Sequence, residues 1–463
     1  MSNDSILLWV DVTTLMHWQR PAVGIVRVEQ QFCLWLLAEQ LPDVGFCGYD
    51  KSSRSFYAVS REQLQAQLDR IQAIGTRQNE AVPSGDWKLH LKHRLKQAIG
   101  YLPPALGVRV FNLLQRLRPH AGRLWRGLVV ARGRLAAARR KEAGGVPRAF
   151  TPVQFAPGSV YVSMGLDWDY KDMADIYRQK QERGFKCLFF CYDIIPVLMP
   201  QLCVADVSRQ FAHYFADLAW AADRILCISD ASRRDLLQLL DTLGVPCASA
   251  ERVHLGGDIL PEGGLQAPSP TVEKVLAEPF ILFVSTIERR KNHETLYRAY
   301  SRLARQGVAL PRLVFVGMSG WGVQELFSDL RLDPMVAGKI ELLHHVDDAD
   351  LAVLYQHAQF TVYPSLYEGW GLPVAESLAF GKYCLASNAA SLPEVGGDWV
   401  DYLDPWDVPG WAERLQFLFA HPEWVAERNA RIAREYRAHP WRETAREIYE
   451  QARALASSSP GQN

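Results

Sequence analysis

Residues 363–381 read YPSLYEGWGLPVAESLAFG, and their pattern indicates the class of the fold. The apolar and aromatic run up to Ser365 is typical of the end of a buried strand, and a loop with two glycines follows it. Pro373 then favours the start of a helix, because proline suits the first helical turn. A strand that leads through a glycine-rich loop into a helix is part of a parallel βαβ unit, whose ligands bind beyond the carboxyl ends of the strands.

The same alternation extends over most of the chain and predicts an α/β fold with parallel sheets. In the first half, strands are expected at 6–12, 45–50, 159–164, 186–193, 224–229 and 252–255, and helices at 24–40, 171–183, 206–221 and 231–243. In the second half, strands are expected at 280–285, 313–317, 340–346, 360–365, 383–387 and 399–404, and helices at 292–306, 349–358, 373–380, 408–421 and, as one long helix, 424–456.

The length of the chain, 463 residues, exceeds what one hydrophobic core usually supports, so two domains are expected. We predict a Rossmann-like domain over 1–255, a linker rich in glycine and proline over 256–279, and a second Rossmann-like domain over 280–440. The two domains would face each other across a cleft. The composition is that of an ordinary globular protein, which excludes disordered and fibrous classes.

The charge of the chain is unevenly distributed. There are 51 basic and 51 acidic residues, a formal net charge of zero. Residues 60–150 interrupt the first half without a strand pattern, and within them residues 88–148 hold fifteen lysines and arginines but one acid. This segment has a net charge of +14, so the rest of the chain has −14. The neutral total therefore does not exclude a charged partner.

The same basic segment shows helical spacing of its apolar residues, from Leu106 to Leu117 and again over 123–135. Basic amphipathic helices with a tryptophan are typical of segments that lie on a membrane surface. A solvated insertion packed on its own domain is the alternative, and the segment lacks the aromatic-interleaved motifs of RNA-binding proteins. The membrane-surface candidates are Arg123, Trp125, Arg126, Arg132 and Arg134.

The N-terminus and the cysteines favour a cytoplasmic protein. The first residues, MSNDSILLWV, have no basic start and too short an apolar run for a signal peptide or a membrane-spanning helix. The eight cysteines have no CxxC pair and no framework spacing, as expected of reduced, buried thiols.

Two stretches contain residues suited to binding an anionic ligand. Glu368 precedes the glycine-rich loop, and Glu376 lies one turn into the helix, whose free N–H groups favour an anion. A carboxylate in that place suits sugar hydroxyls better than phosphate. Directly after the strand at 280–285, Arg290 and Lys291 would neutralise a diphosphate, the first through its fork and the second as a point charge.

The second half resembles the nucleotide-sugar domain of glycosyltransferase family 4, the retaining enzymes with the GT-B architecture. The first half resembles bacterial surface-polysaccharide and O-antigen mannosyltransferase-like members more weakly. The resemblance implies a long C-terminal helix, here 441–463 with the tail, that crosses back to the first domain. The motifs are FVSTIERRKNHETL (283–296), LVFVG (313–317), VDDADLAVLYQHA (346–358), residues 363–381 and ASNAASLPEVGGD (386–398), and in the first half DVTTL (11–15), VGIVRVE (23–29), GSVYVSMGLDW (158–168), FCYDIIPVLMP (190–200) and CISDASRRDL (227–236).

The resemblance implies a role for each candidate residue. Arg290 and Lys291 would hold the donor diphosphate, Glu368 would contact the donor sugar, and Glu376 would contact the nucleoside ribose. Asp193 would orient substrate hydroxyls. Many members carry His-Asp where this chain has Tyr192 and Asp193, so a histidine acting near the acceptor cannot be placed. Further donor candidates are Gly24, Gly371, Leu372 and Gly317, which closes a strand where a ligand or another backbone passes near; the acceptor-side candidates are Asp11, Arg27, Trp168 and Tyr192.

The function implied is that of a retaining hexosyltransferase in lipopolysaccharide or surface-polysaccharide synthesis. It would move a hexose, mannose first, from a nucleotide sugar such as GDP-mannose to a lipid-linked saccharide. No cofactor, metal or nucleic acid is expected, and the enzyme would lie on the anionic inner face of the plasma membrane. The alternatives are a GT-B sugar-nucleotide epimerase or phosphorylase, and a non-catalytic nucleotide-sugar-binding scaffold, which the Tyr192 departure favours.

Overall fold

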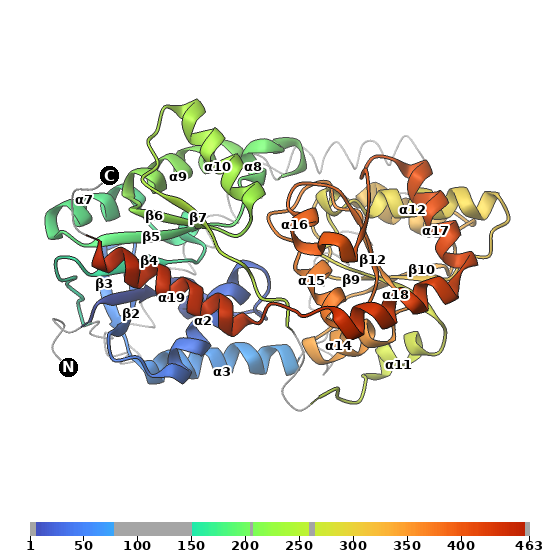
Figure 1. The fold of residues 1–463 in the computed structure, drawn as a ribbon, viewed down its shortest axis with the longest axis horizontal. Coiled ribbons are helices and arrows are strands. Elements are labelled where there is room, and N and C mark those ends of the chain that lie inside the picture. Colours follow the sequence, from blue (N-terminus) through green and yellow to red (C-terminus); the bar gives the residue numbers. More distant parts are fainter. Residues whose placement is uncertain (1–5, 78–150, 204–206, 259–263, 459–463) are drawn as a thin grey trace, which may run out of the picture. The chain divides into compact units, whose positions relative to one another are not determined.

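The computed structural model describes residues 6–77, 151–203, 207–258 and 264–458 (Figure 1). These residues form a seven-stranded sheet and a six-stranded sheet, each flanked by helices. The predicted α/β class with parallel sheets is therefore confirmed. The whole basic segment at 88–148, with its membrane-surface candidates, lies outside the described residues.

The first sheet has the strand order β3-β2-β1-β4-β5-β6-β7. Every neighbouring pair is parallel except β2 and β3, which are antiparallel. The edge strand β3 was not predicted, because its five residues follow the polar turn KSSR and show no long apolar run. The strands are β1 Leu8–Asp11, β2 Val44–Asp50, β3 Ser55–Val59, β4 Val160–Ser163, β5 Lys186–Cys191, β6 Arg224–Cys227 and β7 Ala250–Arg252.

The second sheet is wholly parallel, in the order β10-β9-β8-β11-β12-β13. The central strand β8 pairs with β9 on one side and with β11 on the other, so the loops that follow β8 and β11 leave the sheet at the same edge. The strands are β8 Phe280–Val284, β9 Arg312–Val316, β10 Ile340–Leu343, β11 Thr361–Tyr363, β12 Cys384–Ser387 and β13 Asp401–Leu403.

The helices occupy the connections between these strands, as expected of βαβ units. Helices around the first sheet are α1 Thr13–His17, α2 Ile25–Glu39, α3 Arg61–Arg77, α6 Asp167–Tyr170, α7 Met173–Arg183, α8 Ile195–Leu198, α9 Val207–Ala221 and α10 Asp230–Leu243. Those that follow in the chain are α11 Pro270–Leu276, α12 His293–Arg305, α13 Gln324–Leu332, α14 Asp348–His357, α15 Leu372–Ala379, α16 Leu392–Gly396, α17 Val408–Ala420, α18 Pro422–Glu435 and α19 Trp441–Ser457.

Other parts of the chain also differ from the sequence prediction. The start of the predicted insertion is α3, whose Leu64, Leu68 and Ile71 are fully buried in the first core. The predicted linker contains α11, which begins at the N-cap Ser269 and packs two valines into the second half. Helix α13 was also not predicted. The bounds of the two domains stay a prediction.

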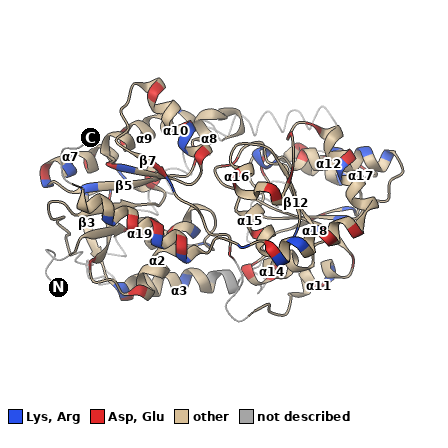
Figure 2. Cartoon of the chain, viewed as in Figure 1, with Lys and Arg blue, Asp and Glu red and all other residues tan. Residues whose placement is uncertain are grey.

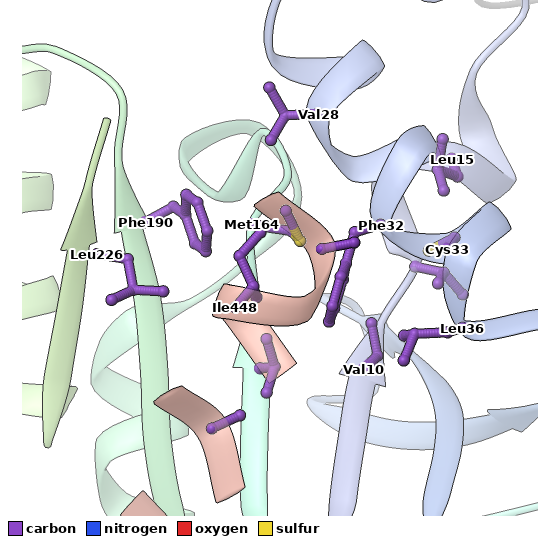
Figure 3. Packing of buried hydrophobic residues seen from close by; sticks show 14 of the residues in the cluster. Val10, Leu15, Val28, Phe32, Cys33, Leu36, Met164, Phe190, Leu226 and Ile448 are labelled. Carbon is purple, nitrogen blue, oxygen red and sulfur yellow. The ribbon is translucent and has the colours of Figure 1, made fainter. Parts of the chain in front are cut away.

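The expected long C-terminal helix is two helices, α18 and α19. The break falls at residues 436–440, where Pro440 lacks a backbone N–H and disfavours helical geometry in the residue before it. Helix α19 packs on the first sheet, as the resemblance implied. Figure 3 shows Ile448 of α19 between Phe32 of α2 and Phe190 of β5, all three in one buried cluster.

Charged residues follow the division between helices and strands. Figure 2 shows acidic and basic residues interspersed along helices such as α18 and α19, whereas the strands are largely uncharged. Strands buried on both faces require this composition. Among the described residues, no helix combines the length and the apolar character needed to span a bilayer.

Candidate functional site

Two loops at one edge of the second sheet bring the predicted cations and a carboxylate together. The loop after β8 ends in a short 3₁₀ turn, Arg289–Lys291, and the loop after β11 carries Glu368. A backbone hydrogen bond of 2.8 Å from Leu366 N–H to the Arg290 carbonyl joins the loops. This placement follows from the parallel pairing of β8 and β11, and it makes the edge of the sheet the candidate site.

The Glu368 carboxylate is the centre of this cluster. Its Oε1 accepts from Lys291 Nζ at 2.6 Å and from the Tyr363 hydroxyl at 3.1 Å, and its Oε2 accepts from an Arg290 nitrogen at 2.8 Å. Burial alone would raise the pKa of Glu368, but Arg290 and Lys291 outweigh it and lower that pKa to about 2. Glu368 is therefore an anion held between two cations.

A further carboxylate, Glu288, was not singled out from the sequence. It is buried, and its Oε1 accepts from the second terminal nitrogen of Arg290 at 2.9 Å. Arg290 also donates to the main-chain carbonyl of Tyr367 at 2.7 Å. The motif ERRK does contain the acid, but nothing in the spacing distinguishes a buried partner of arginine from an exposed loop residue.

The second predicted carboxylate, Glu376, lies in α15 and is also buried. Gly371 caps this helix with φ of 119°, and a Cβ at this position would lie 2.5 Å from a Leu392 methyl, so both the backbone and the space require glycine. Leu372 is the first residue of the helix. Glu376 accepts from the Tyr355 hydroxyl at 2.9 Å, and burial raises the pKa of its carboxyl.

Arg27, which was predicted on the acceptor side, lies beside Glu376. Its guanidinium donates to both Asp348 oxygens at 2.8 Å and lies 3.5 Å from a Glu376 oxygen. Arg27 is buried in α2, the helix that Gly24 caps with φ of 53°. The motif at 23–29 thus contributes to the surroundings of Glu376.

Asp193 lies close to the Glu368 loop. A Cβ built on Gly369 would be 3.0 Å from Asp193 Cβ, and Asp193 itself accepts from the Ile195 N–H at 3.0 Å. Burial raises the pKa of Asp193, and the charge of Arg290 opposes that rise. The structure thus brings Asp193 into the electrostatic surroundings of the cluster.

The other first-half candidates have partners within the fold. The Tyr192 hydroxyl is buried and donates to the Met164 carbonyl at 2.6 Å, so its proton is used in a hydrogen bond within the fold. Asp11 is 1 % exposed and lies 2.9 Å from Lys171 Nζ. Trp168 packs its ring on Phe211. These contacts do not bring Asp11 or Trp168 to the cluster around Glu368, whereas the main-chain carbonyl of Tyr192 lies against Gly369, the residue after Glu368.

Gly317 was predicted to admit a ligand or another backbone. A Cβ at Gly317 would lie 1.9 Å from the Ser285 carbonyl oxygen. The close neighbour is therefore the backbone of the loop that leads to Arg290. Gly317 permits that approach and so helps to set the path of the loop.

Comparisons with solved structures give the class of fold. Sucrose-phosphate synthase from Thermosynechococcus elongatus aligns with a TM-score of 0.56 and 16 % identity over 98 % of this chain and 99 % of that one. Anabaena HepE, solved in complex with UDP, aligns with a TM-score of 0.54 and 13 % identity over 97 % and 100 % of the two chains. The chain therefore has the predicted α/β fold of GT-B glycosyltransferases.

The sequence comparisons give the family of the second half. Residues 270–437 match the family described as Glycosyl transferases group 1, so this segment is a domain of that group. Escherichia coli O-antigen chain mannosyltransferase B is 30 % identical over 54 % of this chain and 65 % of its own length. The serotype-specific mannosyltransferase WbdA of E. coli is 27 % identical over 49 % of this chain. The chain spans 29 % of WbdA and less than two thirds of either relative.

Proposed function

We propose that the chain is a retaining glycosyltransferase that moves a hexose from a nucleotide sugar to a lipid-linked saccharide. The observation that carries this proposal is the cluster of Arg290, Lys291 and Glu368 at the edge of the second sheet, within the segment that matches the glycosyl transferases group 1. Two largely buried cations, together with the glycine-capped helix that follows the Glu368 loop, suit a diphosphate, and the adjacent carboxylate suits sugar hydroxyls.

Each donor group has a partner of matching chemistry in this proposal. Arg290 and Lys291 hold the diphosphate, and the backbone of Gly371 and Leu372 at the start of α15 meets the sugar and phosphate. Glu368 accepts from hydroxyls of the donor sugar. Glu376 accepts from the ribose hydroxyls, and this hydrogen bond replaces its present contact with Arg27. Gly24 and Gly317 keep the α2 start and the β8 loop close to these groups.

The chemical step is stabilisation of the leaving group. As the bond from C1 to the diphosphate oxygen breaks, negative charge grows on the diphosphate, and the two cations and the α15 N-terminus stabilise it more in the transition state than in the ground state. The acceptor oxygen attacks from the same face, its proton passes to the departing diphosphate oxygen, and the configuration at C1 is retained. Asp193 orients a substrate hydroxyl, and no cofactor enters the step.

Mannose, carried by GDP-mannose, is the first donor to test. Two relatives whose names specify mannosyltransferases support this choice. A panel of nucleotide sugars tested for thermal stabilisation identifies the donor directly. A donor at 100 times its Kd stabilises the folded chain by about 2.7 kcal/mol, which is large enough to measure.

The acceptor is proposed to be lipid-linked, at the inner face of the plasma membrane. The sequence of residues 88–148 supports this, because its net charge of +14 is attracted to an anionic leaflet while the remaining −14 is repelled. Reversing Arg123, Arg126, Arg132 and Arg134 to Glu should abolish sedimentation with anionic liposomes. Binding that is insensitive both to this change and to salt contradicts the proposal.

The test of catalysis compares the wild-type chain with Glu368→Ala. An enzyme releases GDP from GDP-mannose, and the variant loses most of that release. A non-catalytic scaffold binds the donor and releases nothing in either form. An epimerase converts the sugar without transfer, and a phosphorylase requires inorganic phosphate, so product analysis distinguishes both from a transferase.

A further inference from the structure

Glu288 is a buried acid in a place where the local backbone does not need it. It precedes the 3₁₀ turn Arg289–Lys291, but its side chain makes no capping hydrogen bond to that turn. The turn instead uses the Glu288 main-chain carbonyl, which accepts from the Lys291 N–H at 3.1 Å. Since Glu288 is 3 % exposed, and a buried carboxylate is costly unless it is paired, its side chain requires another explanation.

That explanation is the contact with Arg290. The guanidinium is held on two sides: one terminal nitrogen donates to Glu368 and to the Tyr367 carbonyl, and the other donates to Glu288. These bonds use three of the five N–H donors of arginine. The bonds to Glu288 and Glu368 fix the plane of the guanidinium at two separate nitrogens.

The two carboxylates have different tasks under the proposed function. Glu368 turns to the donor sugar when the donor binds, which weakens its hold on Arg290. Glu288 comes from the same short loop as Arg290 and has no such second task, so it keeps the guanidinium in place. Two carboxylates and two cations also leave Glu288, Arg290, Lys291 and Glu368 with no net charge, which limits the cost of burying them.

We infer that Glu288 is the positioning residue for Arg290, and that it holds the guanidinium toward the donor diphosphate as charge develops there. This inference rests on the proposed function. This role differs from a purely structural one. Glu288 acts only through Arg290, and only in the step in which negative charge grows on the leaving diphosphate. The effect therefore falls on kcat more than on KM for the donor.

The experiment measures GDP release from GDP-mannose by the full chain. Glu288→Ala should lower kcat about tenfold and change KM for GDP-mannose less than threefold. Glu288→Gln keeps an oxygen that accepts from Arg290, so its kcat should stay within threefold of wild type. The matched control is Glu294→Ala, an exposed acid of α12 that pairs only with Arg298 among the described residues, and it should leave kcat unchanged.

A double-mutant cycle shows whether Glu288 acts through Arg290. In an Arg290→Ala background, Glu288→Ala should produce no further loss. If the losses of the two changes multiply, or if Glu288→Gln is as impaired as Glu288→Ala, the inference is wrong. If Glu288→Ala does not fold, Glu288→Asp replaces it, because the shorter side chain withdraws the carboxylate from Arg290 and should lower kcat in the same way.

The failure of the proposed function has a separate signature. A wild-type chain that neither binds nor hydrolyses any nucleotide sugar overturns the proposed function and this inference together. A wild-type chain that releases GDP while Glu288→Ala matches it in kcat overturns the inference alone.

Discussion

Lys291 Nζ lies 2.6 Å from Oε1 of Glu368, although the two residues belong to loops that follow different strands. Both are largely buried, with 13 % and 7 % of their side chains exposed. A charge pair this well shielded from solvent is stronger than a surface pair, and its geometry depends on the pairing of β8 with β11. The cation and the carboxylate are thus in place before a donor arrives.

Lys291→Ala should reduce GDP release from GDP-mannose at least tenfold. The change removes one cation that stabilises the diphosphate, and the loss of one such group costs about 2–4 kcal/mol of barrier. The fold should persist, because Glu368 keeps its bonds to Arg290 and Tyr363. Turnover and far-UV circular dichroism check this, with the exposed Lys339→Ala as control. Unchanged turnover would remove Lys291 from the site.

Acid should destabilise the chain partly through Glu368. Its folded pKa is about 2 and the unfolded value is 4.5, so the stabilisation is complete above pH 4.5 and is lost as the pH falls toward 2. The contribution is about 3 kcal/mol. Urea unfolding between pH 5 and pH 2.5 should show a shallower loss of stability for Glu368→Gln than for wild type. Parallel curves would show that Glu368 is not the anion that the two cations hold.

Tyr192→Phe should lower stability and leave turnover within threefold. The lost hydroxyl leaves the buried Met164 carbonyl without its 2.6 Å hydrogen bond, which costs about 1 kcal/mol. Thermal unfolding and GDP release are measured on the same preparation. A tenfold fall in turnover without a change in Tm would instead assign Tyr192 a part in the chemistry. Tyr192 would then take a catalytic role at the position where many family members carry histidine.

The sequence predicted those parts of the site that local order determines. The run from Ser365 to Pro373 specifies strand, loop and helix, so the places of Glu368 and Glu376 follow from it. Parallel strands end at one edge of the sheet, so the loop with Arg290 and Lys291 and the loop with Glu368 could be expected at the same edge, but their contacts could not. Within a βαβ unit, the strand end or helix start that a residue occupies can therefore be predicted from the local sequence pattern.

The rest of the site depends on contacts between distant segments. Arg27 comes from α2 and Glu376 from α15, and no spacing in either motif connects them. Asp11 has the sequence context of a ligand-binding loop, yet Lys171, far along the chain, neutralises it. Short elements such as β3 were not predicted for another reason. The five residues of β3 follow a polar turn and are too few to show a recognisable alternation of apolar and polar residues.

His293 should make stability fall with decreasing pH as well, but over a range above that of Glu368. Burial, and then the charge of Lys291, lower the pKa of His293 from 6.5 to about 3. The unfolded chain therefore binds a proton below pH 6.5 that the folded chain does not, and folding weakens as the pH falls from 6.5 to 5, by about 2 kcal/mol. The ring lies between Phe283 and Phe315, so His293→Phe should fit and make the curve flatter over this range. Urea unfolding at pH 7 and pH 5 measures the difference, and an equal slope in both proteins would contradict it.

Glu394→Ala should destabilise the chain by weakening the start of α10. The Glu394 carboxylate accepts from the backbone N–H of Asp230 at 2.7 Å and of Ala231 at 2.8 Å, while the Ser229 hydroxyl accepts from the next N–H. These are the groups that a helix cannot satisfy within itself, and a carboxylate there also meets the positive end of the helix dipole.

The expected loss for Glu394→Ala is about 1 kcal/mol, as for the removal of a capping side chain. Glu394→Gln has one acceptor oxygen in place of two and no charge, so it should fall between alanine and wild type. Glu413→Ala, an exposed acid on α17, is the control and should not alter the free energy of unfolding. If all three variants unfold at the wild-type urea concentration, Glu394 does not cap α10 in solution. A graded series instead identifies a side chain of the ASNAASLPEVGGD motif as the cap of a helix that begins in the CISDASRRDL motif of the first half.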